Sequence, residues 1–123
     1  MHANCLILGG IVLTCSRNEI ELQSCLEEWT LKGYKVYGCK ADVSTEEGRN
    51  ALLKEIELTF NNQLDCLVNS AGYYSSTDYE KQFQTNLDSG FFLTKSCYSL
   101  LKESKKGPSV VNIGSVSGTF LDI

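Results

Sequence analysis

The feature that most constrains the fold of this chain is the alternation of short apolar runs with longer helical patterns. Four runs are rich in β-branched residues and have the length of strands that are buried on both faces. These runs cover residues 11–15, 35–39, 64–69 and 109–113. A helical pattern stands between each run and the next. This order predicts βαβ units and a parallel sheet, an α/β fold of four strands and three helices.

The three predicted helices carry start and stop signals. Asn18 is the expected N-cap of the first helix, with Glu21 three residues later in a capping-box arrangement, and Gly33 is the expected stop. Ser44 is the expected N-cap of the second helix. The third helix is expected from about Asp78 to Glu103. The apolar positions at helical spacing are Leu53, Ile56 and Phe60 in the second helix, and Phe83, Leu87, Phe91 and Thr94 in the third.

The charge and the histidine content of the chain exclude several function classes. A net charge of -4 argues against a nucleic-acid partner, because such proteins usually present a basic face. The single histidine is His2, near the terminus, so we expect no Ser-His-Asp or Cys-His catalysis and no metal site. A chain of 123 residues has the usual length of one domain.

The cysteines and the first apolar segment bear on the cellular compartment. Six cysteines lie mostly inside apolar runs and form no CxxC pair, which predicts reduced thiols and a cytoplasmic location. The apolar segment 5–15 is shorter than the roughly 20 residues that span a bilayer, so we expect a buried strand and its flank, and no membrane contact.

Residues with possible binding roles follow each strand, at the edge where open parallel sheets bind ligands. Ser16 and Arg17 follow the first run, and a guanidinium there suits a phosphate, although a surface arginine is more often simply solvated. Asp42 and Val43 follow the second run. The Asp42 carboxylate has the chemistry to bond an adenine edge while Val43 packs on the ring; the alternative is that Asp42 only favours a helix start.

Small and polar residues follow the other two runs. Asn69, Ser70, Ala71 and Gly72 form either a place where backbone approaches a ligand closely or a plain turn. Ser115 is either a hydroxyl within reach of a ligand or a structural residue.

The ordered set of strand-end residues resembles that of the short-chain dehydrogenase/reductases. The set consists of Arg17, Asp42-Val43, Asn69-x-Ala-Gly and Ser115-x-x-Gly, with Asn86 in the third helix. Within that family the chain looks closest to the tropinone-reductase-like members, on the stretches 14–19 and 85–87. The resemblance covers about residues 9–120.

The resemblance implies an NADP-dependent oxidoreductase that transfers hydride between a nicotinamide and a small carbonyl or alcohol, in a homo-oligomer. It implies that Ser16 and Arg17 hold the adenosine 2′-phosphate and that Asp42 and Val43 contact adenine. The cofactor ribose and phosphates are then expected over Asn69, Ala71 and Gly72. By the same resemblance, Asn86 holds a water in a proton relay and Ser115 bonds the substrate oxygen.

The sequence departs from the family at both ends. The family's catalytic Tyr-x-x-x-Lys lies beyond the serine, and no Tyr or Lys follows Ser115. Tyr98 and Lys102 have that spacing, but they precede Ser115 and are not expected to be the pair. The family's first strand and glycine-rich phosphate loop are represented only by Gly9-Gly10.

We therefore expect residues 1–123 to be a partial dinucleotide-binding domain, an incomplete Rossmann-type sheet whose central first strand is missing or replaced. Residues 5–8 either form a replacement strand through a hairpin at Gly9-Gly10 or are the tail of the lost helix.

Three functions compete at this level. One is a short-chain reductase, catalytically incomplete as this chain stands; a second is a non-catalytic module that retains the adenosine end of the site. A phospho-acceptor receiver domain has this length and alternation but needs an acidic pair after the first strand and a lysine after the last. Ser16-Arg17 and Ser115 stand there instead.

Overall fold

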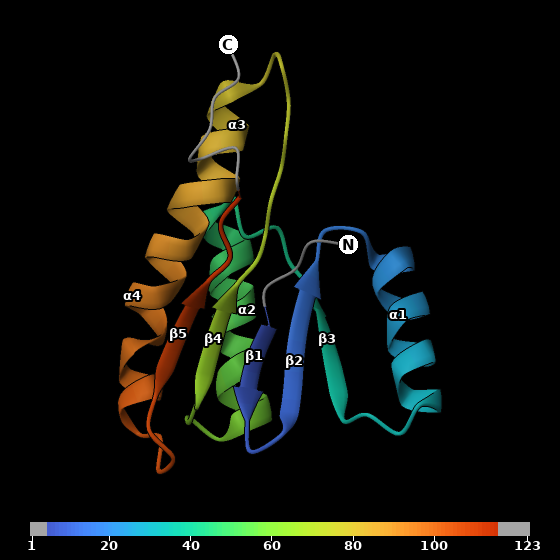
Figure 1. Cartoon of the computed structure of the whole chain (residues 1–123), viewed down its shortest axis with the longest axis vertical. Helices are drawn as coiled ribbons and strands as arrows, with labels where there is room; N and C mark the ends of the chain where they lie inside the picture. Colours follow the sequence, from blue (N-terminus) through green and yellow to red (C-terminus); the bar gives the residue numbers. More distant parts are fainter. Residues whose placement is uncertain (1–4, 116–123) are drawn as a thin grey trace.

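A computed structural model describes residues 5–115, which form one five-stranded mixed sheet with helices on both of its faces (Figure 1). His2 and Gly118 lie outside the described residues. In chain order the elements are β1 (Cys5–Leu8), β2 (Ile11–Ser16), α1 (Glu19–Leu31), β3 (Val36–Lys40), α2 (Glu46–Phe60), β4 (Cys66–Asn69), α3 (Tyr79–Phe83), the π-helix η1 (Gln84–Asp88), α4 (Ser89–Lys102) and β5 (Ser109–Asn112).

The α/β class is confirmed, but the sheet has five strands and is not purely parallel. Its strand order is β3-β2-β1-β4-β5, and β1 in the centre runs antiparallel to both of its neighbours. Gly9 and Gly10 join β1 to β2 with φ angles of 58° and 88°, as a two-residue hairpin turn requires. The hairpin alternative for residues 5–8 is therefore confirmed, and the missing central strand is replaced by a reversed one.

Because β1 is reversed, the Gly9-Gly10 turn and the carboxyl ends of the parallel strands lie at opposite ends of the strands. The pairs β2–β3 and β4–β5 are parallel, so the carboxyl ends of these four strands share one edge. The turn at Gly9-Gly10 lies at the other edge, where the Gly9 N–H donates to Asp65 Oδ2 at 2.9 Å, just before β4. The only paired glycines of the chain are thus remote from the residues that follow the parallel strands.

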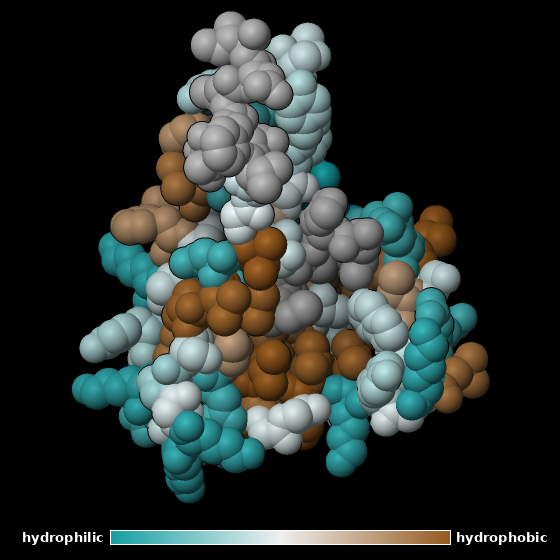
Figure 2. All heavy atoms as spheres, in the orientation of Figure 1, coloured by the Kyte–Doolittle hydropathy of each residue, from teal (hydrophilic) through white to brown (hydrophobic). Residues whose placement is uncertain are grey.

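The hydrophobic core lies between the sheet and the helices α2 and α4, which lie behind the strands in Figure 1. Leu6, Leu13 and Leu67 from the three central strands are fully buried in it. On the opposite face α1 packs against β3, where Gly38 leaves room for the side chains of Leu22 and Leu26. The central strands are less covered on that face, and Figure 2 shows a hydrophobic surface over them.

The predicted start of the first helix is confirmed and that of the second is wrong. Asn18 Oδ1 accepts from the Glu21 N–H, as expected of the N-cap of α1. The N-cap of α2 is Thr45, whose Oγ1 accepts from the Gly48 N–H, because the Ser44 hydroxyl is engaged by Asp42. Leu52 takes the fully buried place expected for Leu53, which is only partly buried against the core.

The predicted third helix is divided into α3, η1 and α4. The Ser89 N–H donates to the Gln84 carbonyl, five residues back, while Ser89 Oγ donates to the Thr85 carbonyl at 2.6 Å. The serine hydroxyl thus bonds to a backbone carbonyl of the π-helical turn. The core face of α4 consists of Ser89, Leu93, Cys97, Leu100 and Leu101, whereas Phe83, Leu87 and Phe91 are 45–63% exposed.

Cysteine 15, 25, 39, 66 and 97 carry free thiols in this structure. Within residues 5–115, no helix has both the length and the apolar character needed to cross a membrane. The same residues contain no group of three His, Cys, Asp or Glu side chains arranged to hold a metal ion.

Candidate nucleotide-binding site

The site residues expected from the sequence lie at the carboxyl edge of the four parallel strands. Arg17 follows β2, Asp42 follows β3, and the segment that begins at Asn69 follows β4. Ser115 is an exposed residue three positions beyond β5. Charged groups from three successive segments come together here, and the structure adds two residues, Tyr73 and Lys81, to those expected.

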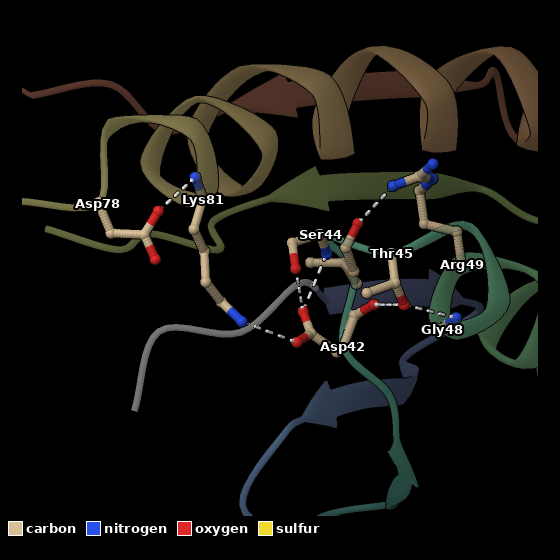
Figure 3. A network of polar contacts seen from close by, with 8 residues as sticks. Asp42, Ser44, Thr45, Gly48, Arg49, Asp78 and Lys81 are labelled. Carbon is tan, nitrogen blue, oxygen red and sulfur yellow. Dashed lines mark hydrogen bonds and ion pairs between the residues drawn. The ribbon is translucent and has the colours of Figure 1, made fainter. Parts of the chain in front are cut away.

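Asp42 is the centre of a polar network (Figure 3). Its Oδ1 accepts from the Ser44 N–H at 3.0 Å and from the Ser44 hydroxyl at 2.6 Å, an Asx-turn geometry. Its carbonyl accepts from Thr45 N–H and Oγ1. Its other carboxylate oxygen, Oδ2, lies 3.6 Å from Lys81 Nζ of α3. Asp42 therefore shapes the start of α2 with one oxygen and presents the second to a cation.

The surroundings of Asp42 hold its side chain in the charged form. Partial burial raises the pKa of the carboxyl, but the two hydrogen bonds from Ser44 and the positive charges of Lys81 and Arg17 outweigh it. The pKa of Asp42 consequently lies below its ordinary value.

Arg17 is exposed at the end of β2, and its guanidinium lies over the ring of Tyr73, 5.5 Å from the ring centroid. Such a cation–π contact restricts the side chain without using its N–H donors. Ser16 Oγ accepts from the Asn18 N–H at 3.2 Å, so the serine hydroxyl also belongs to the turn into α1.

Asn86, in η1, fixes the segment after β4. Its Oδ1 accepts from the Tyr73 N–H at 2.8 Å and its Nδ2 donates to the Tyr73 carbonyl at 2.9 Å. An amide has two donors and two lone pairs, so each end of the side chain retains one for water or ligand. Asn86 thus holds the backbone of the residue whose ring supports Arg17.

An open groove of about 750 Å³ lies beside the carboxyl ends of β4 and β5. Asn69, in its wall, donates from Nδ2 to Thr94 Oγ1 at 3.2 Å and to Asn112 Oδ1 at 2.9 Å, while its Oδ1 is buried without a hydrogen-bond partner. The groove is lined by Asn69, Ala71, Asn86, Leu87, Ser89, Gly90, Phe91, Thr94, Lys95, Tyr98, Asn112 and Ile113.

Two expected residues, Val43 and Gly72, are less available than the sequence pattern indicates. Val43 is 6% exposed within the core, so little of its side chain can meet a ring. A Cβ added at Gly72 meets nothing within 4 Å, so only a ligand close to its backbone would require glycine there. Tyr98 lines the groove, whereas Lys102 lies in the last turn of α4 and does not.

The described residues fit the adenosine end of a dinucleotide better than its pyrophosphate. Arg17 and Lys81 supply positive charge and Asp42 Oδ2 supplies an acceptor at one place on the carboxyl edge. The glycine turn that would be needed for a pyrophosphate lies at the opposite edge, at Gly9-Gly10.

The family model of the short chain dehydrogenases matches residues 3–121. The chain belongs to the short-chain dehydrogenase family. A chloroplastic tropinone reductase homolog of Arabidopsis thaliana is 40% identical over 119 residues, and another homolog of that plant is 37% identical over 130 residues. These matches cover 90% and 91% of this chain but only 37% and 48% of the two relatives. The chain thus spans less than half the length of these relatives.

Solved structures of other proteins share this fold. A 7α-hydroxysteroid dehydrogenase complexed with NADH and 7-oxo glycochenodeoxycholic acid superimposes with a TM-score of 0.79 at 19% identity. An actinorhodin polyketide ketoreductase with NADPH gives 0.77 at 25% identity. The matches cover 90% and 88% of this chain, and 46% and 44% of those chains. The fold of residues 5–115 is therefore a partial Rossmann-type fold.

Sequence reasoning missed Tyr73 and Lys81. Lys81 had one available signal, its place in the first helical turn after the capping residue Asp78. Nothing local indicates that it meets Asp42, because that ion pair depends on where the fold places α3 relative to the loop after β3.

Proposed function

We propose that this chain carries the adenosine end of an NADP site and represents part of an NADP-dependent oxidoreductase that acts on a small carbonyl or alcohol. The observation that supports the proposal most is the meeting of Arg17, Asp42 and Lys81 at the carboxyl edge of the sheet. Two cations beside one carboxylate leave positive charge for a phosphate, and the family membership supplies the class of cofactor.

Each proposed binding residue has a physical role. Arg17 presents a rigid fork of N–H donors to the 2′-phosphate, with Ser16 beside it. Asp42 accepts from the adenine amino group through Oδ2, and the small part of Val43 that is not buried contacts the ring. Asn69, Ala71 and Gly72 lie under the ribose and phosphates. When bound, the nicotinamide supplies the hydride.

The proposed catalytic residues are Asn86 and Ser115. Asn86 has one donor and one lone pair left for a water after its two bonds to Tyr73, and Ser115 presents a hydroxyl beyond β5. No Tyr or Lys follows Ser115 in these 123 residues, so we expect binding without turnover from this chain alone. Homo-oligomerisation, which the resemblance implies, is part of the proposal.

Calorimetric titration of the 123-residue chain with NADP and with NAD tests the binding. We expect NADP to bind more tightly, and the Arg17→Gln variant to lose this preference. Lys105→Gln is a matched control, because Lys105 is an exposed residue between α4 and β5, at the opposite edge of the sheet. Equal affinity of the wild-type chain for the two cofactors would contradict the role of Arg17.

A non-catalytic nucleotide-binding module is the second candidate function. The reversed β1 favours it, because the glycine turn faces away from the site. NADPH-dependent reduction of a panel of carbonyl compounds distinguishes the two functions. Turnover by this chain that persists after replacing Tyr98 and Lys102 would show that a different acid–base group operates.

A further inference from the structure

Lys81 has a contact at its backbone and another at its ammonium group. Its backbone N–H donates to Asp78 Oδ1 at 3.0 Å, which fixes its place in the first turn of α3. Its ammonium reaches Asp42 Oδ2, and Figure 3 shows the side chain extended from α3 toward the carboxylate. The side chains of Lys81 and Asp42 are 36% and 29% exposed. An ion pair with this exposure contributes little to stability, so stability alone gives no reason for the arrangement.

Two positive side chains, Lys81 and Arg17, act on the Asp42 carboxylate. One oxygen of Asp42 is occupied by both donors of Ser44, so a single oxygen remains to face Lys81. Arg17 stands on the ring of Tyr73 and keeps its N–H donors available. The Asp42 carboxylate is therefore shared by two cationic side chains of different kinds, an ammonium and a guanidinium.

We propose that Lys81 is a second phosphate-binding cation and determines specificity together with Arg17, with Asp42 holding its ammonium in place before the ligand arrives. The inference rests on the proposed function, since the phosphate is the 2′-phosphate of the adenosine end. A phosphate dianion takes the guanidinium fork from one side and the compact ammonium from another. Asp42 then positions Lys81 as well as accepting from adenine.

Titration with two small probes separates this role from general electrostatics. The probes are 2′,5′-ADP, which carries the 2′-phosphate, and 5′-AMP, which lacks it. For Lys81→Gln we expect affinity for 2′,5′-ADP to fall about tenfold, the size of one charge-assisted hydrogen bond, while affinity for 5′-AMP changes less than about twofold. Lys81→Arg restores most of the loss. Lys105→Gln, with the same change of net charge at the opposite edge, leaves both affinities unchanged.

The variant Asp42→Asn tests whether Lys81 acts directly. Its loss of the adenine acceptor weakens both probes alike. Its loss of the contact that positions Lys81 lowers the ratio of the two affinities, but by less than Lys81→Gln does, because the ammonium is still present. If Asp42→Asn lowers the ratio as much as Lys81→Gln does, the effect of Lys81 runs through Asp42 and the proposal is wrong. Circular dichroism of each variant checks that the fold is retained.

The outcomes for this inference and for the proposed function are distinguishable. If the wild-type chain prefers 2′,5′-ADP, and Arg17→Gln removes the preference while Lys81→Gln keeps it, the role of Lys81 is wrong and the NADP site stands. If the wild-type chain binds both probes equally, the NADP site itself is wrong.

Discussion

Gly48 lies in the first turn of α2, and its substitution by alanine should destabilise the protein although it improves helix propensity. A Cβ built on Gly48 would lie 1.9 Å from the Asp42 carbonyl oxygen, 2.6 Å from the Asp42 carbonyl carbon and 2.8 Å from the Asp42 nitrogen. All three atoms are backbone, so no side-chain rotation relieves the contact. Glycine is therefore required here by the close approach of the helix to the strand-end loop.

The size of the effect follows from three contributions. Replacing a helical glycine by alanine gains up to about 1 kcal/mol. Overpacking of a well-packed site costs about 1–3 kcal/mol, and contacts with immobile backbone place Gly48→Ala at the upper end. Moving the loop also disturbs the cap between Thr45 Oγ1 and the Gly48 N–H, worth about 1 kcal/mol. We expect the free energy of unfolding to fall by about 3 kcal/mol.

Urea unfolding followed by circular dichroism measures this loss. With an m-value of about 1–3 kcal/mol/M, the midpoint should fall by roughly 1–3 M. Gly38→Ala is the matched control, because its Cβ would meet the end of the flexible Leu26 side chain at 2.5 Å. We expect that variant to lose less than about 1 kcal/mol, since the leucine can change its rotamer.

The reasoning would be refuted if Gly48→Ala were as stable as the wild-type chain or more stable. That result would mean that helix propensity outweighs the contact and that the loop carrying Asp42 yields without cost. Equal losses for the Gly48 and Gly38 variants would equally contradict the distinction between backbone and side-chain neighbours.

Three further outcomes are expected. Asn86→Asp keeps the acceptor for the Tyr73 N–H and loses the donor to the Tyr73 carbonyl, whereas Asn86→Leu loses both bonds, of about 1 kcal/mol each. Hydrogen exchange of the Tyr73 amide should therefore be slower in Asn86→Asp than in Asn86→Leu. Equal rates would contradict the hydrogen bonding of Asn86 to the Tyr73 backbone. The pKa of Asp42 lies below its unfolded value, so its contribution to stability is present above pH about 4 and is lost as pH falls through the folded pKa. Lys81→Gln should raise the folded pKa of Asp42 in a carbon NMR titration, and an unchanged value would refute the ion pair. Burial raises the pKa of Cys97 to about 12, so iodoacetamide at pH 8 should alkylate the half-buried Cys25 before Cys97. Mass spectrometry of the peptides measures the order, and alkylation of Cys97 before Cys25 would contradict the burial of Cys97.

The type and order of most elements could be predicted from the sequence, because those signals are local. The cap at Asn18 and the β-branched runs act within a few residues, and they indicate α1 and the four parallel strands correctly to within about two residues. The carboxyl ends of parallel strands share an edge by geometry, so the neighbourhood of Arg17 and Asp42 also followed from the sequence. The roles of these two residues stay predictions.

Local signals failed where two local choices were equally good. Residues 5–8 suit a strand or a helix tail. A reversed central strand forms because it pairs with the backbone groups of β2 and β4, which would otherwise lack hydrogen-bond partners. Ser44 and Thr45 both suit an N-cap. The Ser44 hydroxyl donates to the Asp42 carboxylate, so Thr45 caps the helix. Each choice depends on hydrogen bonds that form only when distant strands or loops are in place.

The sequence by itself determined the α/β alternation, the family and the polar residues at the strand ends. Only the tertiary structure decided that β1 turns the glycine pair away from those residues, that Asn86 holds the backbone of Tyr73, and that Lys81 meets Asp42. The physical reason is the range of the interactions. Propensity and capping act along the chain, whereas the charges that shape this site come from segments that only packing brings together.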